Sequence, residues 1–548
     1  MRKLFFLLIS IVFFFSCQQP KKSADLLVFN ANVYTVQDSM PRAEAFAVKD
    51  GKFIGVGTSE VLKKTYSFSD SLNAEGKTII PGIIDAHCHF YGLGLQQQKV
   101  DLTGTTSYED VISRIVAFQK EKNVSFITGR GWDQNDWELQ EFPTKEKLDS
   151  LFPDTPVAVT RVDGHAMLVN QKALDLAKIT VETKVSGGEI LQKDGQLTGI
   201  LIDNPMELVE AVFPAPTREE QIAALQEAEA INFSYGLTTV DDAGLSPEVI
   251  SLIDSLQKSE ALKIRMYAMV SNVPEYVDQY LADGVYKTER LNVSSFKVYA
   301  DGALGSRGAV LKEAYTDKEN HFGAMVIGVA EFKKLAKTIA DSDFQMNTHA
   351  IGDSANAVVM NTYYEVLKDK SDRRWRVEHA QVVAPTEFEI LNDNLVMSVQ
   401  PTHATSDMYW ADERLGEERI KGAYAYKKLL EKTGKIALGT DYPVENVSPF
   451  YTFYAAVARK DLKQYPEGGF QKQDALSREE TLKGMTIWAA YSNFEELEKG
   501  SIEVNKLADF VILEENIMGI DEDRIPNVKV IKTYIGGEMV YEKSNAKK

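Results

Sequence analysis

Short apolar segments that end in polar residues alternate with helical stretches through most of this chain, and this alternation constrains the fold more than any other feature. The segments are "IIPGIIDAHCH", "SFITGRGWD", "PVAVTRVDGH", "LTTVDDAG", "KIRMYAMV", "SSFKVYADG", "FQMNTHAIGD", "RWRVEHAQ", "LVMSVQPTH" and "KIALGTDYP". Helical stretches such as "GVAEFKKLAKTIADSD" separate them. This pattern is typical of strand–helix units around a parallel sheet. We therefore expect an α/β fold built on a (β/α)8 barrel.

The ten candidate strands exceed the eight that a barrel needs, so two of them must belong elsewhere. The spacing is irregular between Val100 and about Leu225, where "VSGGEILQKDGQLTGI" resembles an extra hairpin. We expect an insertion at about 100–225, lying over the mouth of the barrel.

Both ends of the chain are rich in β-type segments. Asp50-Gly51 and Gly536-Gly537 each lie between apolar runs, which is a hairpin signal. We expect residues 26–79 and 496–548 to pair into one small β-sandwich domain, with the barrel at 80–495 inserted between them.

The N-terminal stretch "MRKLFFLLISIVFFFSC" has a basic start and an apolar run from Leu4 to Phe15. The run is shorter than the about 20 residues that span a bilayer, so it predicts a signal peptide. A small residue directly before Cys17 resembles a bacterial lipobox. We expect a signal peptide at 1–16, a lipidated Cys17 and a polar tether at 17–25; the alternative is a plain secretory signal with an incidental cysteine.

This interpretation predicts an exported protein attached to a membrane through its lipid only. Gln18 follows the cysteine, where an Asp retains many lipoproteins at the inner membrane. By this resemblance we expect the periplasmic face of the outer membrane. The formal net charge of -19 argues against a nucleic-acid partner, because phosphate binding needs concentrated Lys and Arg.

His87 and His89 stand one residue apart at the end of the first candidate strand. Side chains alternate along a strand, so both point to one face while Cys88 points to the other. Alone, the pair fits either a metal site or a hydrogen-bonded buried pair.

Three further residues end separate candidate strands, namely His349, His379 and Asp441. Each has a simple structural alternative: a strand-end histidine is usually hydrogen-bonded, and an Asp before Tyr-Pro is usually a turn former. Together they would meet at the C-terminal face of a barrel, where active sites of such barrels lie.

At this point the sequence resembles the amidohydrolase superfamily, and within it the amidohydrolase family 3 branch that includes N-substituted formamide deformylases. The matching motifs are "PGIIDAHCH", "FKVYADGALGSRGA", "NTHAIGD", "VEHAQ", "SVQPTHA", "ALGTDYPV" and "GSIEVNKLADFVIL". Asn505 in the last motif stands where Gly is usual in the family. The resemblance covers nearly the whole chain after the signal peptide.

The resemblance implies a set of metal ligands, which is His87, His89, Lys297, His349, His379 and Asp441. Lys297 matches a lysine that family members can carry as an N-carboxylated bridge between two ions. An unmodified Lys, with a pKa of about 10.4, is a cation and cannot ligate a metal. The structural alternative is a Lys that pairs with Asp301 or another carboxylate, and then one ion is expected.

Zinc suits a site of imidazoles and carboxylates. The expected cofactor is one or two Zn²⁺ ions, two if Lys297 is carboxylated. A bound metal lowers the pKa of water to roughly 7. Asp441 would take the proton of that water and deliver it to the leaving nitrogen.

Candidate substrate-binding residues are less constrained by the sequence. Each also has an ordinary structural alternative, such as an ion pair for Arg or core packing for Trp. The candidates are His165, Arg161, Arg307, His403 and Trp132.

The expected function is metal-dependent hydrolysis of carbon–nitrogen bonds other than peptide bonds, in small amides or in N-acyl and N-formyl compounds. A lactone or phosphoester hydrolase on the same scaffold is one alternative. A lipid-anchored binding protein without turnover is another, although the complete ligand set argues against it.

Overall fold

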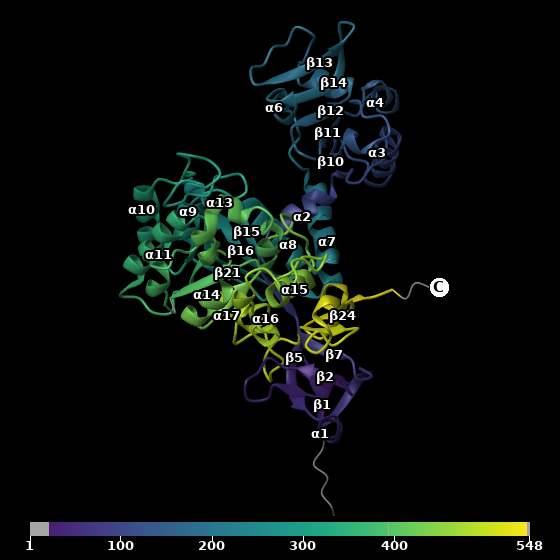
Figure 1. The fold of residues 1–548 in the computed structure, drawn as a ribbon. Helices are drawn as coiled ribbons and strands as arrows, with labels where there is room; N and C mark the ends of the chain where they lie inside the picture. Colours follow the sequence, from purple (N-terminus) through teal and green to yellow (C-terminus); the bar gives the residue numbers. More distant parts are fainter. Residues whose placement is uncertain (1–20, 393, 545–548) are drawn as a thin grey trace, which may run out of the picture.

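The computed structural model describes residues 21–392 and 394–544 and has three parts (Figure 1). These are a central barrel, a β-sandwich that contains both chain ends, and a lobe inserted after the first barrel strand. The expected signal peptide and Cys17 lie outside the described residues. Within the described part, no helix is both long and apolar enough to cross a membrane.

The barrel consists of eight parallel strands that follow one another in chain order around the sheet. They are β8 (Ile83–Cys88), β15 (Leu237–Leu245), β16 (Arg265–Ser271), β18 (Leu291–Tyr299), β19 (Gln345–Ala350), β20 (Trp375–His379), β21 (Leu395–Val399) and β22 (Ile436–Leu438). The last strand returns to the first, because the Asp441 N–H donates to the His87 carbonyl at 2.8 Å just beyond β22. The expected α/β barrel is confirmed.

Helices cover the outside of this barrel (Figure 1). Two of them begin with side-chain caps: Thr217 and Glu220 form a capping box, and Ser246 accepts from the Val249 N–H. Apolar side chains from strands and helices merge into one large core. The helices of the barrel are α2 (Phe90–Gln97), α7 (Arg218–Ser234), α8 (Pro247–Lys258), α9 (Pro274–Asp283), α10 (Val329–Ala340), α11 (Asp353–Leu367), α12 (Pro401–Asp407), α13 (Ala411–Arg419), α14 (Tyr426–Thr433), α15 (Pro449–Ala458), α16 (Arg478–Gly484) and α17 (Ile487–Ser492).

Two small sheets form the β-sandwich. The first has the order β5 (Lys52–Gly57), β4 (Ala45–Lys49), β1 (Lys22–Phe29), β6 (Tyr66–Asn73). The second has the order β25 (Glu538–Glu542), β24 (Val530–Ile535), β23 (Phe510–Leu513), β7 (Thr78–Pro81), β2 (Asn32–Tyr34), β3 (Arg42–Ala43), so it joins both chain ends. Phe46 of the first sheet packs against Phe510 of the second, with ring centroids 4.8 Å apart.

The hairpin turns lie at Asp50-Gly51 and Gly536-Gly537, and all four residues have positive φ, as a two-residue hairpin of type I′ requires. The expected tether is wrong for Lys22 to Asp25. These residues begin β1 and pair in parallel with β6, because Ala24 has a buried place between the strands.

The insertion is a lobe with its own six-stranded sheet, and it holds both surplus strands. The order is β13 (Gly188–Lys193), β14 (Gln196–Asp203), β12 (Ala166–Val169), β11 (Val157–Arg161), β10 (Ile127–Trp132), β9 (Val100–Asp101). Its helices are α3 (Tyr108–Lys122), α4 (Glu146–Leu151), α5 (Gln171–Leu176) and α6 (Pro205–Glu210). The lobe has two apolar clusters of its own and is joined to the barrel through α2 and α7 (Figure 1).

The expectation that the insertion covers the barrel mouth is wrong. Side chains at or after the ends of three barrel strands remain exposed: Tyr299 at the end of β18 at 43%, Tyr409 after β21 at 54% and Val444 after β22 at 70%. The lobe instead projects from one side of the barrel (Figure 1). The two helices that join the lobe to the barrel pack closely, because Gly94 of α2 lies directly on the backbone of Ala224 in α7 and leaves no space for a side chain.

Candidate metal centre

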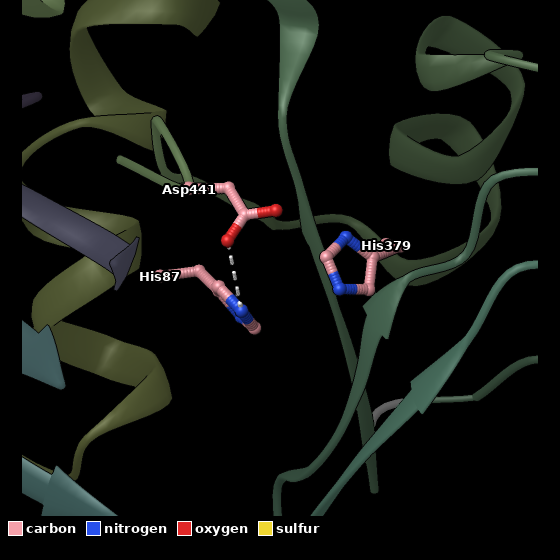
Figure 2. Close-up of side chains that lie close together, drawn as sticks. All are labelled: His87, His379 and Asp441. Atoms are coloured by element: carbon pink, nitrogen blue, oxygen red, sulfur yellow. Dashed lines mark ion pairs between the residues drawn. The ribbon is translucent and has the colours of Figure 1, made fainter. Parts of the chain in front are cut away.

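Three side chains from separate barrel strands converge at the C-terminal face. The possible ligand atoms of His87, His379 and Asp441 all lie within 4.8 Å of one another. Figure 2 shows the three side chains directed toward one space. Parallel strands bring their carboxyl ends to one edge, which is why residues so far apart in sequence meet there.

His89 joins the same group from the residue after β8. Its Nε2 lies 3.3 Å from Oδ1 of Asp441, and Nε2 of His87 lies 3.7 Å from the same oxygen. Cys88 between them points the other way, into the apolar core with Phe90. The strand alternation that the sequence indicated therefore sets the direction of all three side chains.

His349 and Lys297 complete the cluster. The rings of His349 and His379 have centroids 4.5 Å apart, and His349 Nε2 is buried without a hydrogen-bond partner. Lys297 is 1% exposed, and its Nζ lies 3.1 Å from Nε2 of His87. The structure thus gathers all six residues that the motifs indicated around one space.

Two of the inner histidines, His87 and His379, have their Nδ1 side held by a neighbouring side chain. His87 Nδ1 lies 2.5 Å from Oε2 of Glu378, and His379 Nδ1 lies 2.7 Å from Oε1 of Gln400. These acceptors fix the proton on Nδ1 and leave the Nε2 lone pair free. Metal-binding histidines are typically oriented in this way.

The three inner imidazoles are neutral. Burial, together with the nearby Lys297 charge, lowers the pKa of His87 to about 4 and that of His349 to about 3. Burial together with the neighbouring histidines holds the pKa of His379 well below its usual range. A neutral imidazole is the form that binds a metal.

His403, at the start of α12, has the opposite charge state. Burial alone would lower its pKa, but hydrogen bonds of 3.2 Å to Asp441 and to Glu445 raise it to about 10. Both ring nitrogens then carry protons and have no lone pair for a metal. His403 and His89 also hold the pKa of Asp441 well below its usual range, against the effect of burial.

Lys297 does not form the ion pair with Asp301 that was one expectation. Asp301 accepts the N–H groups of Val310, Ile351 and Gly352 at 2.8 to 3.0 Å. Among the described residues, no carboxylate lies within ion-pair distance of Nζ of Lys297, and burial lowers the pKa of this amine to about 8.

The donor set fits a divalent metal ion. It offers neutral imidazoles with fixed tautomers, an ionised carboxylate, and a buried Nε2 on His349 that nothing else satisfies. Mixed imidazole and carboxylate ligands suit zinc and similar ions.

The family model for the amidohydrolase family matches residues 70–541. This chain belongs to the amidohydrolase family. Protein LONG AFTER FAR-RED 3 of Arabidopsis thaliana is 33% identical, covering 94% of this chain and 92% of its own length. The N-substituted formamide deformylase of Arthrobacter pascens is 24% identical, covering 95% and 99%.

A solved structure of similar shape is the metal-dependent hydrolase of Pyrococcus horikoshii. It has a TM-score of 0.75 and 28% sequence identity, and it covers 91% of this chain and 99% of its own. The expected family and the expectation of an enzyme are confirmed: the protein is a metal-dependent hydrolase of the amidohydrolase superfamily.

Of the five candidate substrate-binding residues, this amidohydrolase brings only His403 to the metal centre. Trp132 is wholly buried in the insertion, where its Nε1 donates to the Val159 carbonyl at 2.8 Å. The expectation that it lines a substrate pocket is therefore wrong, and Trp132 packs the core of the lobe.

The two candidate arginines are held by carboxylates. Arg161, in the insertion, pairs with Asp133 at 2.6 Å and with Asp163. Arg307, in the segment after β18, pairs with Asp317 at 2.6 Å. Both guanidinium groups are thus engaged in ion pairs, which is the structural alternative to the expected substrate binding.

The remaining candidate, His165, is in a turn of the insertion. Its exposed ring lies 2.8 Å from Oδ1 of Asp203, in the same lobe. The structure does not bring it to the cluster of strand-end histidines.

Four residues of this amidohydrolase site had no place in the sequence interpretation. Glu378, Gln400 and Glu445 hold ligand or neighbouring histidines, as described above. Tyr299 lies beside the metal centre, with its ring centroid 5.5 Å from that of His349. Three of them lie inside motifs that the sequence already singled out. The sequence does not show which side chains surround each motif residue, and that information was needed to recognise them.

Proposed function

We propose that this amidohydrolase hydrolyses carbon–nitrogen bonds other than peptide bonds in small amides, among them N-formyl and N-acyl compounds. The observation that carries this proposal is the position of Asp441. Its carboxylate lies between the neutral ligand histidine His87 and the protonated His403. A carboxylate at that place can accept a proton next to a metal and release it again.

His87, His89, His349, His379 and Asp441 would hold the metal, and we propose zinc. When bound, such an ion polarises a carbonyl and lowers the pKa of water to roughly 7. Asp441 accepts the proton of the attacking water and transfers it to the leaving nitrogen. His403 donates to Oδ2 of Asp441 at 3.2 Å and so keeps the other oxygen directed at the histidines.

We further propose that Lys297 carries an N-carboxyl group that bridges two ions. The neutral amine adds to CO2, a nitrogen–carbon bond forms, and one proton leaves. Burial without a carboxylate partner and a pKa of about 8 support this, because they make the neutral amine accessible. If Lys297 stays unmodified, a single ion is expected.

Hydrolysis of a panel of compounds by metal-loaded protein tests the proposal. The panel contains N-formyl amines, N-acetyl amines, cyclic ureides, lactones and phosphomonoesters. We expect turnover of the carbon–nitrogen compounds and a loss of at least a thousandfold in kcat for Asp441→Asn. The matched control is Asp412→Asn, an exposed aspartate of α13, which should keep the wild-type rate.

Two outcomes would refute this function. One is turnover of only the lactone or only the phosphomonoester. The other is a metal-loaded protein that hydrolyses nothing in the panel and is unaffected by Asp441→Asn, which would favour a binding protein.

The location is a separate proposal, supported by the sequence alone. We propose that Cys17 is lipidated and holds the protein at the periplasmic face of the outer membrane. Cys17→Ala should then move the protein from the membrane fraction to the soluble fraction. Continued membrane association of this variant would contradict lipidation.

A further inference from the structure

A large cleft lies between the insertion and the barrel, next to the metal centre. Its volume is about 820 Å³, within the range of roughly 300–1,000 Å³ of small-molecule sites. One wall is the sheet of the insertion, with Thr128, Arg130 and Thr160 in adjacent positions of β10 and β11. The opposite wall is formed by α2, with Gln96, and by Lys99 just after the helix.

The barrel end of this cleft adjoins two proposed metal ligands. It is formed by Gly92 and Pro443, which follow His89 by three residues and Asp441 by two. A Cβ placed on Gly92 would lie 3.3 Å from Cβ of His89 and 4.0 Å from Cδ of Pro443. The barrel end of the cleft therefore adjoins the metal centre, although none of the six proposed metal ligands lines the cleft itself.

Arg130 is the cation that the sequence interpretation did not consider. Its Nη2 donates to the Val162 carbonyl at 3.0 Å, and Gly164 packs closely beside it. Among the described residues, no carboxylate lies within ion-pair distance of its guanidinium. One side of the planar group is thus fixed by backbone while its other donors remain available.

Asp101 lies next to Arg130 in the sheet but does not pair with it. It is the neighbour of Arg130 in the register of β9 and β10, yet the two form no ion pair. Its Oδ1 instead accepts the Thr103 N–H at 2.9 Å. Arg130 therefore has a donor fork that Asp101 does not occupy, and planar bidentate binding of carboxylate suits arginine better than lysine.

We propose that this cleft binds the non-reacting part of the substrate and that Arg130 binds a carboxylate on it. The substrate class is an N-acyl or N-formyl compound with a free carboxylate, such as an N-formyl amino acid. This inference rests on the proposed function, because it places the scissile amide at the metal centre. Glu210 also lines the cleft, so the surface of the cleft is not uniformly positive. Selection for a substrate carboxylate therefore acts at the end of the cleft that contains Arg130.

Two probes that differ by one carboxylate test the inference, N-formylphenylalanine and N-formylphenethylamine. Metal-loaded wild type should have the higher kcat/KM for the acid. Arg130→Gln should lower the acid-to-amine ratio of kcat/KM by about tenfold to a hundredfold, mainly through KM, since hydrogen bonds to a charged group are lost. Arg130→Lys should restore the ratio in part, because charge remains but the fork does not.

Two further variants sharpen the test. Asp101→Asn should raise the ratio, because a negative charge beside the carboxylate is removed. Arg290→Gln is the control: this arginine pairs with Glu260 at 2.9 Å and does not line the cleft, so the ratio should stay at the wild-type value. An unchanged ratio in Arg130→Gln, or an equal change in Arg290→Gln, overturns the inference.

Binding separates this inference from the proposed function. If wild type hydrolyses neither probe, the proposed hydrolysis of formamides fails, and calorimetric titration with N-formylphenylalanine decides on the cleft. At least tenfold weaker binding to Arg130→Gln then supports the site. Equal dissociation constants for the two proteins refute it, whether or not the compounds are hydrolysed.

Discussion

Two polar regions inside the barrel differ in how completely their atoms are bonded. On the N-terminal side, the guanidinium of Arg376 is wholly buried and uses all its nitrogen atoms. It bonds to Asp241 and to Glu378 at 2.7 Å each, to Asn493 at 3.1 Å, to Ser398 at 3.0 Å and to the Ala86 carbonyl.

At the C-terminal side the bonding is incomplete. His349 Nε2 is buried without a hydrogen-bond partner, with Oδ1 of Asp301 at 3.7 Å, and Lys297 has no carboxylate at ion-pair distance among the described residues. Lys297 is as buried as Arg376, at 1% against 0% exposed, so burial does not explain the difference between these two cations. Buried polar groups are normally satisfied, and those left open mark the place where a ligand completes the structure.

Glu378 connects the two regions. One carboxylate oxygen accepts from Nε of Arg376, and the other lies 2.5 Å from Nδ1 of His87. The closed network therefore fixes the orientation of a proposed metal ligand. Substitutions on either side of Glu378 should separate a structural effect from an effect on metal binding.

The largest expected effect is that of Arg376→Met. It leaves the carboxylates of Asp241 and Glu378 buried without their cation, which should lower the free energy of unfolding by about 3–5 kcal/mol. Urea denaturation measures this loss. The control is Arg373→Met, a half-buried arginine that donates only to backbone carbonyls. Equal losses for the two variants would show that the buried network contributes no more to the free energy of unfolding than the backbone hydrogen bonds of Arg373.

A second effect separates the two kinds of histidine by pH. The folded pKa of His403 is about 10 against a usual 6.5, so its stabilisation is complete below pH 6.5 and is lost as pH rises to 10. The folded pKa of His87 is about 4, so its contribution changes in the separate window from pH 4 to 6.5, where stability rises with pH.

In metal-free protein, the wild-type advantage over His403→Gln should be about 2–3 kcal/mol near pH 6 and should vanish toward pH 10. Urea unfolding at several pH values measures it. His165→Gln, at an exposed histidine of the insertion, is the control and should leave this window unchanged. An advantage that is constant from pH 6 to 10 would contradict the protonated His403.

A third effect concerns metal affinity. Glu378→Gln keeps the shape of the side chain but removes the charge that holds the Nδ1 proton of His87. We expect metal affinity to fall about tenfold to a hundredfold, as for other partners of ligand histidines. Competition with a chromogenic chelator measures it. Glu495→Gln, at another buried glutamate, should have the wild-type affinity; the same loss there would remove the special role of Glu378.

The barrel and the main ligand candidates could be predicted from the sequence because both depend on simple periodicity. Parallel strands place their polar ends at one face, and alternation orients His87 and His89 together. The two surplus strands were recognisable from their irregular spacing. None of these inferences needs to know which side chains touch.

Glu378 could not be found in that way. Alternation in a regular strand would place Glu378 and His379 on opposite faces, but the chain turns at the end of β20, where His379 has a φ of 72°. Both side chains therefore reach the interior. The fates of Arg161 and Trp132 depend on partners within a lobe whose position relative to the barrel no local pattern encodes.

The smallest expected effect on stability, and the one of opposite sign, is that of Lys297→Met. In chelated protein the ammonium of Lys297 is buried beside His87 without a carboxylate at ion-pair distance among the described residues, so an apolar side chain of similar volume should be neutral or stabilising by up to about 1 kcal/mol. If the lysine bridges two ions, bound metal should fall by about half or more. Urea unfolding and elemental analysis measure the two quantities on the same preparation.

Lys312→Met, whose ammonium pairs with Glu387, is the control and should lose stability while metal content stays constant. A Lys297→Met protein could instead be less stable than wild type and hold as much metal. Lys297 would then belong to the fully bonded network around Arg376 and not to the metal centre.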